Sequence, residues 1–189
     1  MKMSQTQALE VLAQHRSDQI VITTMSAVAI WPQLSDGPLD FSYIPSTMGQ
    51  GPSLGLGLAL ALPDRDVIVV NGDGCMLMNL GSLVTLASYP ANLFLIVMVN
   101  GIYEVTGGQE TVGSGRIDFA GIARSAGILR VYTFRDLIGW EQGAAEALGG
   151  RGPVFIELEV EARYGQKTPK SPHPMQEQIA RLQQALGVT

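Results

Sequence analysis

DVIVVNGDGCMLMNLGSLVTLASYPANLFLIVMVNGIYEVTGGQ, residues 66–109, decides the fold, because it holds two strands, the amphipathic helix between them and the turn that follows each strand. Residues 67–70 and 93–99 are unbroken apolar runs, which are typical of parallel strands covered on both faces. A right-handed crossover leaves the carboxyl ends of both strands on one side of the sheet. We therefore expect Asp73 and Asn100, which follow the two strands, to face one crevice.

The composition limits the classes of function. The chain has 189 residues, 46% of them hydrophobic, which predicts a single domain over 1–189. A net charge of -5, without a dense cluster of Lys and Arg, argues against nucleic acid or an anionic membrane as a partner. One cysteine excludes an intramolecular disulfide and a four-thiolate metal or iron–sulfur site built from this chain alone. Because no apolar run reaches about 18 residues, we expect a cytoplasmic protein without a membrane segment.

The segments before residue 66 alternate between helix and strand. Residues 4–15 have apolar residues at helical spacing, with Ser4 as a cap, and 19–22 predict a short strand. Residues 32–46 contain three prolines and predict an irregular loop. The small and apolar residues after it predict a helix that ends at Pro63, buried on most sides and covered in part by another subunit.

The same alternation continues after residue 109. Helices are predicted over 118–128 and 134–148, and strands over 129–134 and 153–161. Residues 163–189 predict an extended surface tail that ends in a short amphipathic helix. This order indicates an α/β, doubly wound, mainly parallel sheet with helices on both faces.

The turn after the first central strand suits a phosphate and a hard cation. Gly72 and Gly74 leave backbone N–H groups free where a strand meets a helix, and the Asp73 carboxylate lies between them. No Lys-Ser/Thr pair follows, and Leu77 occupies the third-glycine position of the dinucleotide motif, so neither common phosphate loop is present. With the Asn100 amide oxygen, a carbonyl, phosphate oxygens and water, this turn predicts an octahedral magnesium–diphosphate site.

These residues resemble the signature of thiamine diphosphate enzymes, in which Gly-Asp-Gly (72–74) is followed by 25 residues and then Asn100. Residues 46–61 resemble the glycine-rich stretch that precedes this signature, and the segments 100–111, 118–128 and 152–161 resemble, in order and spacing, the later segments of sulfopyruvate and phosphonopyruvate decarboxylases. The alternative is a glycine turn in an ordinary flavodoxin-like domain. The resemblance implies a thiamine diphosphate-binding fold of the diphosphate-binding (C-terminal) type, with thiamine diphosphate and Mg²⁺ as cofactors.

The resemblance also implies roles for individual residues. Asp73, Asn100 and the Ile102 carbonyl correspond to the metal ligands, and Glu104 and Gln109 border the substrate. The implied cofactor-binding residues are Thr23, Thr24, Ser46, Met48, Gly72, Gly74, Cys75 and Tyr103.

Some of these assignments have specific alternatives. Met48 matches the bulky residue under the cofactor, and the Ser46 carbonyl matches the acceptor for its amino group, although a methionine at a helix start is commonly a core residue. The hydroxyls of Thr23 and Thr24 either face an anion or bond local backbone. Cys75 replaces a frequent serine or alanine, and a small buried side chain suffices there.

A few positions depart from the family pattern or stand apart from the signature. Val99 replaces the first asparagine of an Asn-Asn pair without removing a metal ligand. Glu104 is either a site residue or a solvated loop carboxylate, and His15 and His173 are more typical of surface residues.

The activating glutamate of this family belongs to a separate pyrimidine-binding domain, and no catalytic residue of that kind is evident in this chain. The resemblance therefore implies a β-type subunit that is inactive alone, in a hetero-oligomer with a pyrimidine-domain (α-type) subunit and contacts between β subunits, acting on a small 2-oxoacid. For an anionic substrate, Arg116 and Lys167 are the nearest cationic candidates. Alternatives are a non-catalytic thiamine diphosphate-binding module, or a β subunit of an acetolactate synthase-like enzyme or an oxoacid oxidoreductase.

Overall fold

A six-stranded parallel sheet forms the centre of the molecule, in the order β2-β1-β3-β4-β6-β5. The structure is a computed structural model and describes residues 2–45 and 48–188. The strands are β1 (Ile20–Thr23), β2 (Asp40–Ser42), β3 (Val67–Gly72), β4 (Leu93–Val99), β5 (Arg130–Phe134) and β6 (Val154–Glu159). The prediction of a doubly wound parallel α/β fold is therefore confirmed.

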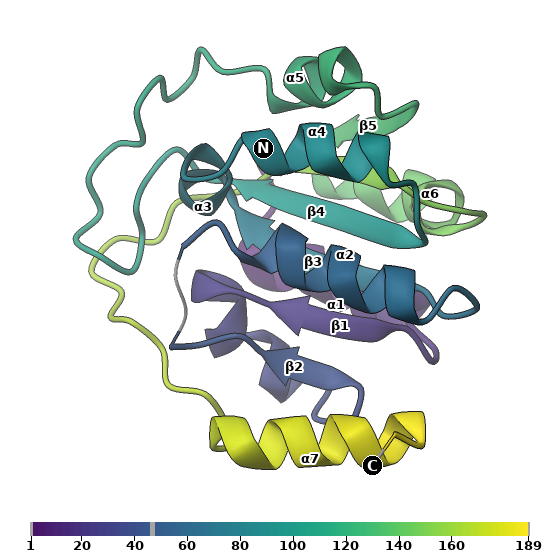
Figure 1. Cartoon of the computed structure of the whole chain (residues 1–189). Coiled ribbons are helices and arrows are strands. Elements are labelled where there is room, and N and C mark those ends of the chain that lie inside the picture. The colour runs from purple at the N-terminus through teal and green to yellow at the C-terminus, as the bar shows by residue number, and fades with distance from the viewer. Residues whose placement is uncertain (1, 46–47, 189) are drawn as a thin grey trace.

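Helices cover both faces of this sheet (Figure 1). The α-helices are α1 (Gln5–His15), α2 (Gly51–Ala61), α3 (Asp73–Leu77), α4 (Gly81–Ser88), α5 (Phe119–Ala126), α6 (Leu137–Leu148) and α7 (Met175–Leu186), and two 3-10 turns lie at Met25–Ala29 and Trp31–Gln33. One core cluster joins α1 and α6 to one face, and a second joins α2, α4 and α5 to the other. The helix α7 packs beside the edge strand β2.

Side-chain caps set several of the helix starts. Ser4 forms a capping box with Gln7 at the start of α1, as its position predicts. Asp118 and Asp136 accept hydrogen bonds from backbone N–H groups at the starts of α5 and α6. These three side chains explain why helices begin directly after polar turns.

Two sequence predictions are wrong in detail. The predicted loop 32–46 contains β2, which pairs with β1 in the register Val21–Asp40 to Thr23–Ser42 and buries Phe41. Tertiary pairing and burial decide this strand, because three residues are too few to show a period. The single helix predicted after Gly74 is two helices, α3 and α4, interrupted between Leu77 and Gly81.

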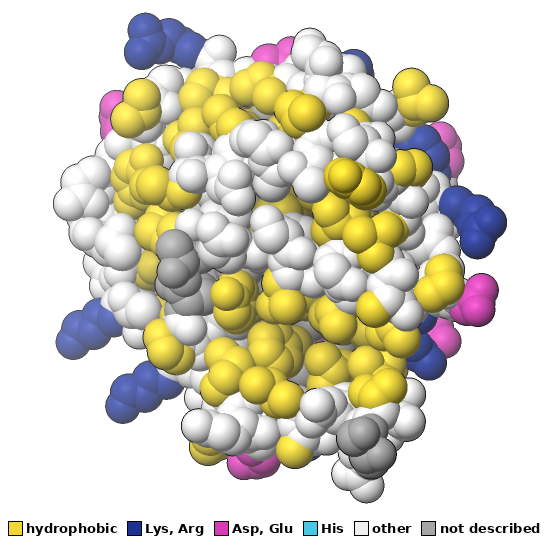
Figure 2. Space-filling view, in the orientation of Figure 1, with side chains coloured by type: hydrophobic (Ala, Val, Ile, Leu, Met, Phe, Trp, Pro, Cys, Tyr) yellow, Lys and Arg dark blue, Asp and Glu magenta, His cyan; other side chains and the backbone are white. Residues whose placement is uncertain are grey.

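The small residues of α2 bring it close to the sheet. A Cβ at Gly55 would lie 2.3 Å from Val69 and 2.9 Å from Leu93, so only glycine permits this approach. The other side of α2 is exposed, with Leu60 at 50% and Val84 of neighbouring α4 at 56%, and Figure 2 shows apolar side chains gathered across this face. The cover expected from another subunit remains a prediction.

Among the described residues, none of the helices has both the length and the apolar character needed to cross a bilayer.

Candidate functional site

Asp73 and Asn100 meet at the carboxyl edge of the sheet. β3 ends at Gly72 and β4 at Val99, and the strands pair in register as far as Gly72 opposite Met98. The next residues after these strand ends, Asp73 and Asn100, line the same two adjoining pockets. The topology therefore brings them together as the sequence predicts.

Asp73 is a buried carboxylate held by backbone amides. It is 2% exposed, and its oxygens accept from Gly74 N at 2.9 Å and from Gly101 N at 2.8 Å. Burial raises the pKa of Asp73, while the hydrogen bonds from Gly101, Gly74 and the Thr111 side chain oppose that rise. No ion pair to Asp73 is found among the described residues, so a bound cation would compensate this buried charge.

Asn100 is oriented by hydrogen bonds at both ends of its amide. Its Nδ2 donates to Glu104 at 2.9 Å, and its Oδ1 accepts from Ile102 N at 3.0 Å. Ile102 forms an antiparallel bridge with Glu110 between two backbone hydrogen bonds, Thr111 N to Gly101 O and Tyr103 N to Gln109 O. The N–H and C=O of Ile102 therefore point away from Glu110, and the N–H reaches Asn100.

The predicted metal ligands fit a hard cation. Within the described part of the chain, no three His, Cys, Asp or Glu side chains gather to hold a metal. A metal here would instead take one carboxylate, one amide oxygen and one carbonyl, which is the oxygen set that Mg²⁺ accepts together with phosphate and water.

The backbone beside Asp73 is closely covered by the loop that follows β4. A Cβ at Gly74 would lie 2.7 Å from the ring of Tyr103. Cys75 is 3% exposed, and burial raises the pKa of its thiol, which favours a packing role over a reactive one. Met48, Gly72, Gly74, Cys75 and Tyr103 all line one pocket with Asp73 and Asn100.

This pocket is too small for a cofactor within the described chain alone. Its volume is about 30 Å³, and the adjoining hollow on the other side of Asp73 and Asn100 measures about 510 Å³. Ligand pockets commonly enclose about 300–1,000 Å³. Arg116 lines the larger hollow, whereas Lys167 is exposed on the tail.

The two threonines at the end of β1, Thr23 and Thr24, differ in their hydrogen bonds. The Thr24 hydroxyl lies within hydrogen-bonding distance of Val70 O at 3.1 Å and Asn71 Oδ1 at 3.0 Å, so it contacts the neighbouring strand β3 rather than local backbone. Thr23 Oγ1 and Asn71 Nδ2 are buried without a hydrogen-bond partner in the described structure. Because such groups are rare, this edge of β1 and β3 retains unused donor capacity.

The remaining predicted positions lie around the same loop or outside the description. Gln109 is exposed and contributes its backbone carbonyl to the bond with Tyr103. Ser46 lies outside the described residues. His15 is exposed, and His173 contacts Asp36 at 3.0 Å, so neither is part of this pocket.

Three residues that support the site were not predicted, namely Gln5, Arg163 and Thr111. Glu104 is buried rather than solvated, and it receives hydrogen bonds from Gln5 and Arg163, which lie 99 and 59 residues away. Thr111 supports Asp73 through its side chain. Neither Gln5 nor Arg163 lies in a recognisable motif, so only the folded structure identifies them.

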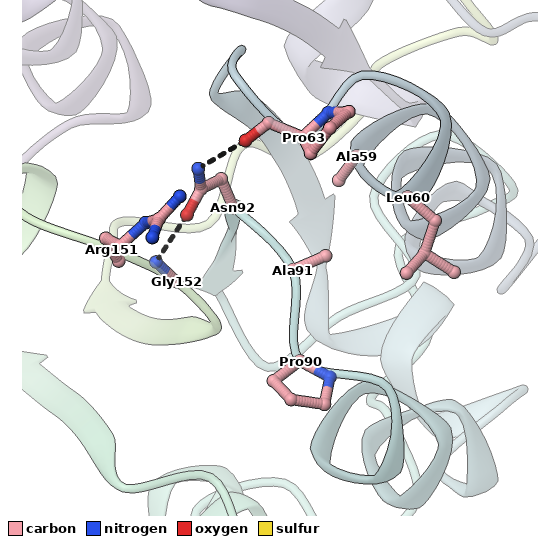
Figure 3. Close-up of a pocket in the computed structure, with 8 residues that line it drawn as sticks. All are labelled: Ala59, Leu60, Pro63, Pro90, Ala91, Asn92, Arg151 and Gly152. Carbon is pink, nitrogen blue, oxygen red and sulfur yellow. Dashed lines mark hydrogen bonds between the residues drawn. The ribbon is translucent and has the colours of Figure 1, made fainter.

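A separate hollow of about 320 Å³ lies at the amino edge of the sheet, between the end of α2 and the loop before β4 (Figure 3). Its Asn92 donates to Pro63 O at 3.0 Å and accepts from Gly152 N at 3.3 Å. Backbone groups therefore pair both ends of this amide, and no carboxylate lines this hollow among the described residues.

The chain and its fold have known relatives. Residues 22–158 match the family described as "Thiamine pyrophosphate enzyme, C-terminal TPP binding domain". The sulfopyruvate decarboxylase subunit beta of Methanothermobacter thermautotrophicus is 37% identical over 166 residues, covering 85% of this chain and 83% of that protein. The phosphonopyruvate decarboxylase of Streptomyces viridochromogenes is 36% identical over 155 residues, covering 81% of this chain but only 38% of that protein.

A solved structure shows the same architecture. Benzoylformate decarboxylase from Polynucleobacter necessarius superposes with a TM-score of 0.75 at 18% identity, covering 88% of this chain and 34% of that one. At this identity the likeness establishes the fold.

Proposed function

Because the chain belongs to the family of thiamine pyrophosphate enzyme C-terminal TPP-binding domains, we propose that it binds thiamine diphosphate with Mg²⁺ as the β-type subunit of a 2-oxoacid decarboxylase. The observation that carries this proposal is the pair of strand ends, where Asp73 and Asn100 line one pocket. A buried carboxylate without a cationic partner in the described chain supports the metal half of the proposal.

In the proposed arrangement, each residue of the site has a specific task. Asp73, Asn100 and the Ile102 carbonyl hold Mg²⁺, and the backbone N–H groups of Gly74 and Cys75 donate to the diphosphate. When bound, thiamine diphosphate supplies the electron sink for decarboxylation. The chain's own contribution is to fix the diphosphate end through oxygen ligands that are already oriented by backbone hydrogen bonds.

The proposal includes a second, pyrimidine-binding subunit that supplies the activating glutamate. The extent of the match to a protein named as a β subunit supports it, because the match covers 85% of this chain and 83% of that protein. The exposed apolar face on α2 and α4 offers a surface for such contacts (Figure 2).

We propose a small anionic 2-oxoacid as the substrate, of the sulfonate or phosphonate type. The relatives in the comparison are named for sulfopyruvate and phosphonopyruvate. Arg116, which lines the hollow beside Asp73, is one cationic group in reach of this site.

The first test is cofactor binding. Calorimetric titration of the chain, purified with its co-expressed pyrimidine-domain subunit, should show thiamine diphosphate binding that requires Mg²⁺. Asp73→Ala should abolish it, whereas Asp64→Ala, in an exposed turn, should bind normally. Retained metal-dependent binding in Asp73→Ala would overturn the metal assignment.

The second test is turnover. Release of carbon dioxide should be measured with 2-oxoacids that carry sulfonate, phosphonate or alkyl groups. Activity on the sulfonate or phosphonate acids supports the proposal. Cofactor binding without release from any of them would instead identify a non-catalytic binding module.

A further inference from the structure

Glu104 gathers three distant parts of the chain around one buried carboxylate. Its side chain is 2% exposed, and its Oε1 accepts from Arg163 Nε at 3.1 Å and Nη2 at 3.0 Å. Its Oε2 accepts from Asn100 Nδ2 at 2.9 Å, from Arg163 N at 3.3 Å and from the side-chain amide of Gln5. The contact therefore joins the metal-site loop to α1 and to the tail that follows β6.

The carboxylate decides which way the Asn100 amide faces. An ionised carboxylate only accepts, so Asn100 must turn its NH₂ toward Glu104 and its oxygen away. That oxygen then lies on the side of Ile102 N, at 3.0 Å. The opposite rotamer would present NH₂ both to the Ile102 N–H and where an oxygen ligand is needed, and without Glu104 only the Ile102 contact would oppose it.

Arg163 pairs with Glu104 and holds its side chain in place. Its side chain is 32% exposed, while that of Glu104 is 2% exposed, so the cation closes the solvent side of the carboxylate. Two guanidinium nitrogens on one oxygen make a charge-assisted contact that is stronger than a neutral hydrogen bond. The position of the tail at residue 163 is thereby linked to the loop that carries Asn100.

We propose that Glu104 is a positioning residue that selects the metal-binding orientation of Asn100, and that Arg163 links the tail to metal affinity through it. This inference rests on the proposed function, because it assigns Asn100 to the metal. It adds a role for the buried Glu104–Arg163 pair, which does not itself touch the cation. Partners behind metal ligands commonly change metal affinity by about 10–100-fold when they are replaced.

A reciprocal exchange tests the orientation. Asn100→Asp creates a second carboxylate opposite Glu104, so the apparent affinity for Mg²⁺ should fall by about 10–100-fold although a carboxylate is normally the better ligand. Adding Glu104→Gln should return at least about tenfold of that loss, because the new amide can donate to the new carboxylate. Gln5 Oε1, buried without a partner in the described structure, can then accept from the same amide after a flip.

The measurement is the Mg²⁺ dependence of thiamine diphosphate binding, followed by calorimetry on the subunit complex, with far-UV circular dichroism to confirm folding. A matched control is Glu110→Gln on the same loop, whose exposed carboxylate should leave Mg²⁺ affinity unchanged. If Asn100→Asp binds Mg²⁺ as well as the unmodified chain, or if the double variant is no better than Asn100→Asp, the orienting role is wrong.

Arg163→Met tests the link to the tail while leaving Glu104 and Asn100 intact, and it carries the test if Asn100→Asp does not fold. Mg²⁺ affinity should fall by about tenfold, whereas Lys170→Met, on the exposed tail, should have no effect. A lower melting temperature with unchanged Mg²⁺ affinity would show a purely structural pair and overturn the inference. Failure of the unmodified complex to bind the cofactor would instead refute the proposed function.

Discussion

Two asparagines stand at opposite ends of β4 and have different tasks. Asn92, before the strand, donates to Pro63 O at 3.0 Å and accepts from Gly152 N at 3.3 Å, so backbone groups pair both ends of its amide (Figure 3). Asn100, after the strand, donates to the Glu104 side chain, accepts from Ile102 N at 3.0 Å and lines two pockets together with Asp73. Asn92 therefore connects two loops, whereas Asn100 lies beside the buried carboxylate of the candidate site.

One glycine at each edge also differs in the space around it. A Cβ at Gly152, at the amino edge, would lie 2.5 Å from Ala91 O and 2.6 Å from Leu93 N. A Cβ at Gly72, at the carboxyl edge, would meet nothing within 4 Å. Backbone atoms therefore leave no room for a side chain at Gly152, whereas Gly72 has free space at the edge where parallel α/β sheets bind ligands.

The largest expected effect is a loss of stability on substitution of Gly152 at the amino edge. Gly152→Ala should lower the free energy of unfolding by about 3 kcal/mol, because the new methyl group meets rigid backbone atoms rather than a mobile side chain. Urea denaturation measures this change. A loss below about 1 kcal/mol would mean that the backbone around Gly152 can shift to make room for the methyl group.

Substitution of Asn100 should mainly affect cofactor binding, whereas substitution of Asn92 should mainly affect the free energy of unfolding. Asn100→Ala should weaken Mg²⁺-dependent binding of thiamine diphosphate by about 100-fold, because a ligand oxygen is removed. Asn92→Ala should instead cost about 1–2 kcal/mol of stability through its two lost hydrogen bonds and leave binding unchanged. Calorimetry and urea denaturation of both variants check this crossover, and equal losses of binding would contradict it.

Gly72 tests the opposite case, a glycine with free space around its Cα. Its φ of -100° suits any residue, so Gly72→Ala should change the free energy of unfolding by only about 0.5 kcal/mol. The added methyl group should nevertheless reduce cofactor affinity by about tenfold if the diphosphate lies against this turn. Unchanged affinity in a titration would place the diphosphate elsewhere.

Much of the fold was predictable because its signals are local. The apolar runs 67–70 and 93–99, with the polar turns after them, indicate paired parallel strands, and β3 and β4 pair as expected. The strand β2 was missed, since its three residues depend on pairing with β1. The meeting of Asp73 and Asn100 follows from topology alone.

The residues that support Asp73 and Asn100 were less predictable, because some of them are distant in the sequence. Glu104 has the sequence surroundings of a loop carboxylate, but Arg163 and Gln5 enclose it from 59 and 99 residues away. The unpaired Asn71 Nδ2 likewise has no sequence signal, as its burial depends on how α2 and β3 pack. Sequence spacing can identify ligands that follow neighbouring strands. Some of the residues that support those ligands are distant in the sequence, so only the folded structure identifies them.

The smallest effects concern one carboxyl group at each edge. Burial raises the pKa of Glu157 at the carboxyl edge, where its side chain accepts from Ala120 N at 3.0 Å. Burial and the charge of Asp18 raise the pKa of Asp66 at the amino edge, with Arg151 opposing them. A raised pKa means that the folded state holds the proton more tightly, so each group's contribution to stability falls as pH rises from the unfolded value through the folded pKa.

Neutral replacements should remove these slopes. Glu157→Gln keeps the acceptor for Ala120 N, so its stability relative to the unmodified chain should increase as pH rises from 4 to 7, by about 0.5 kcal/mol or less. Asp66→Asn should change in the same direction but less, because Asp66 is more exposed and faces Arg151. Urea denaturation across that pH range measures both differences, and a gain that shrinks toward pH 7 would show that the carboxylate at that edge is stabilised rather than penalised by its surroundings.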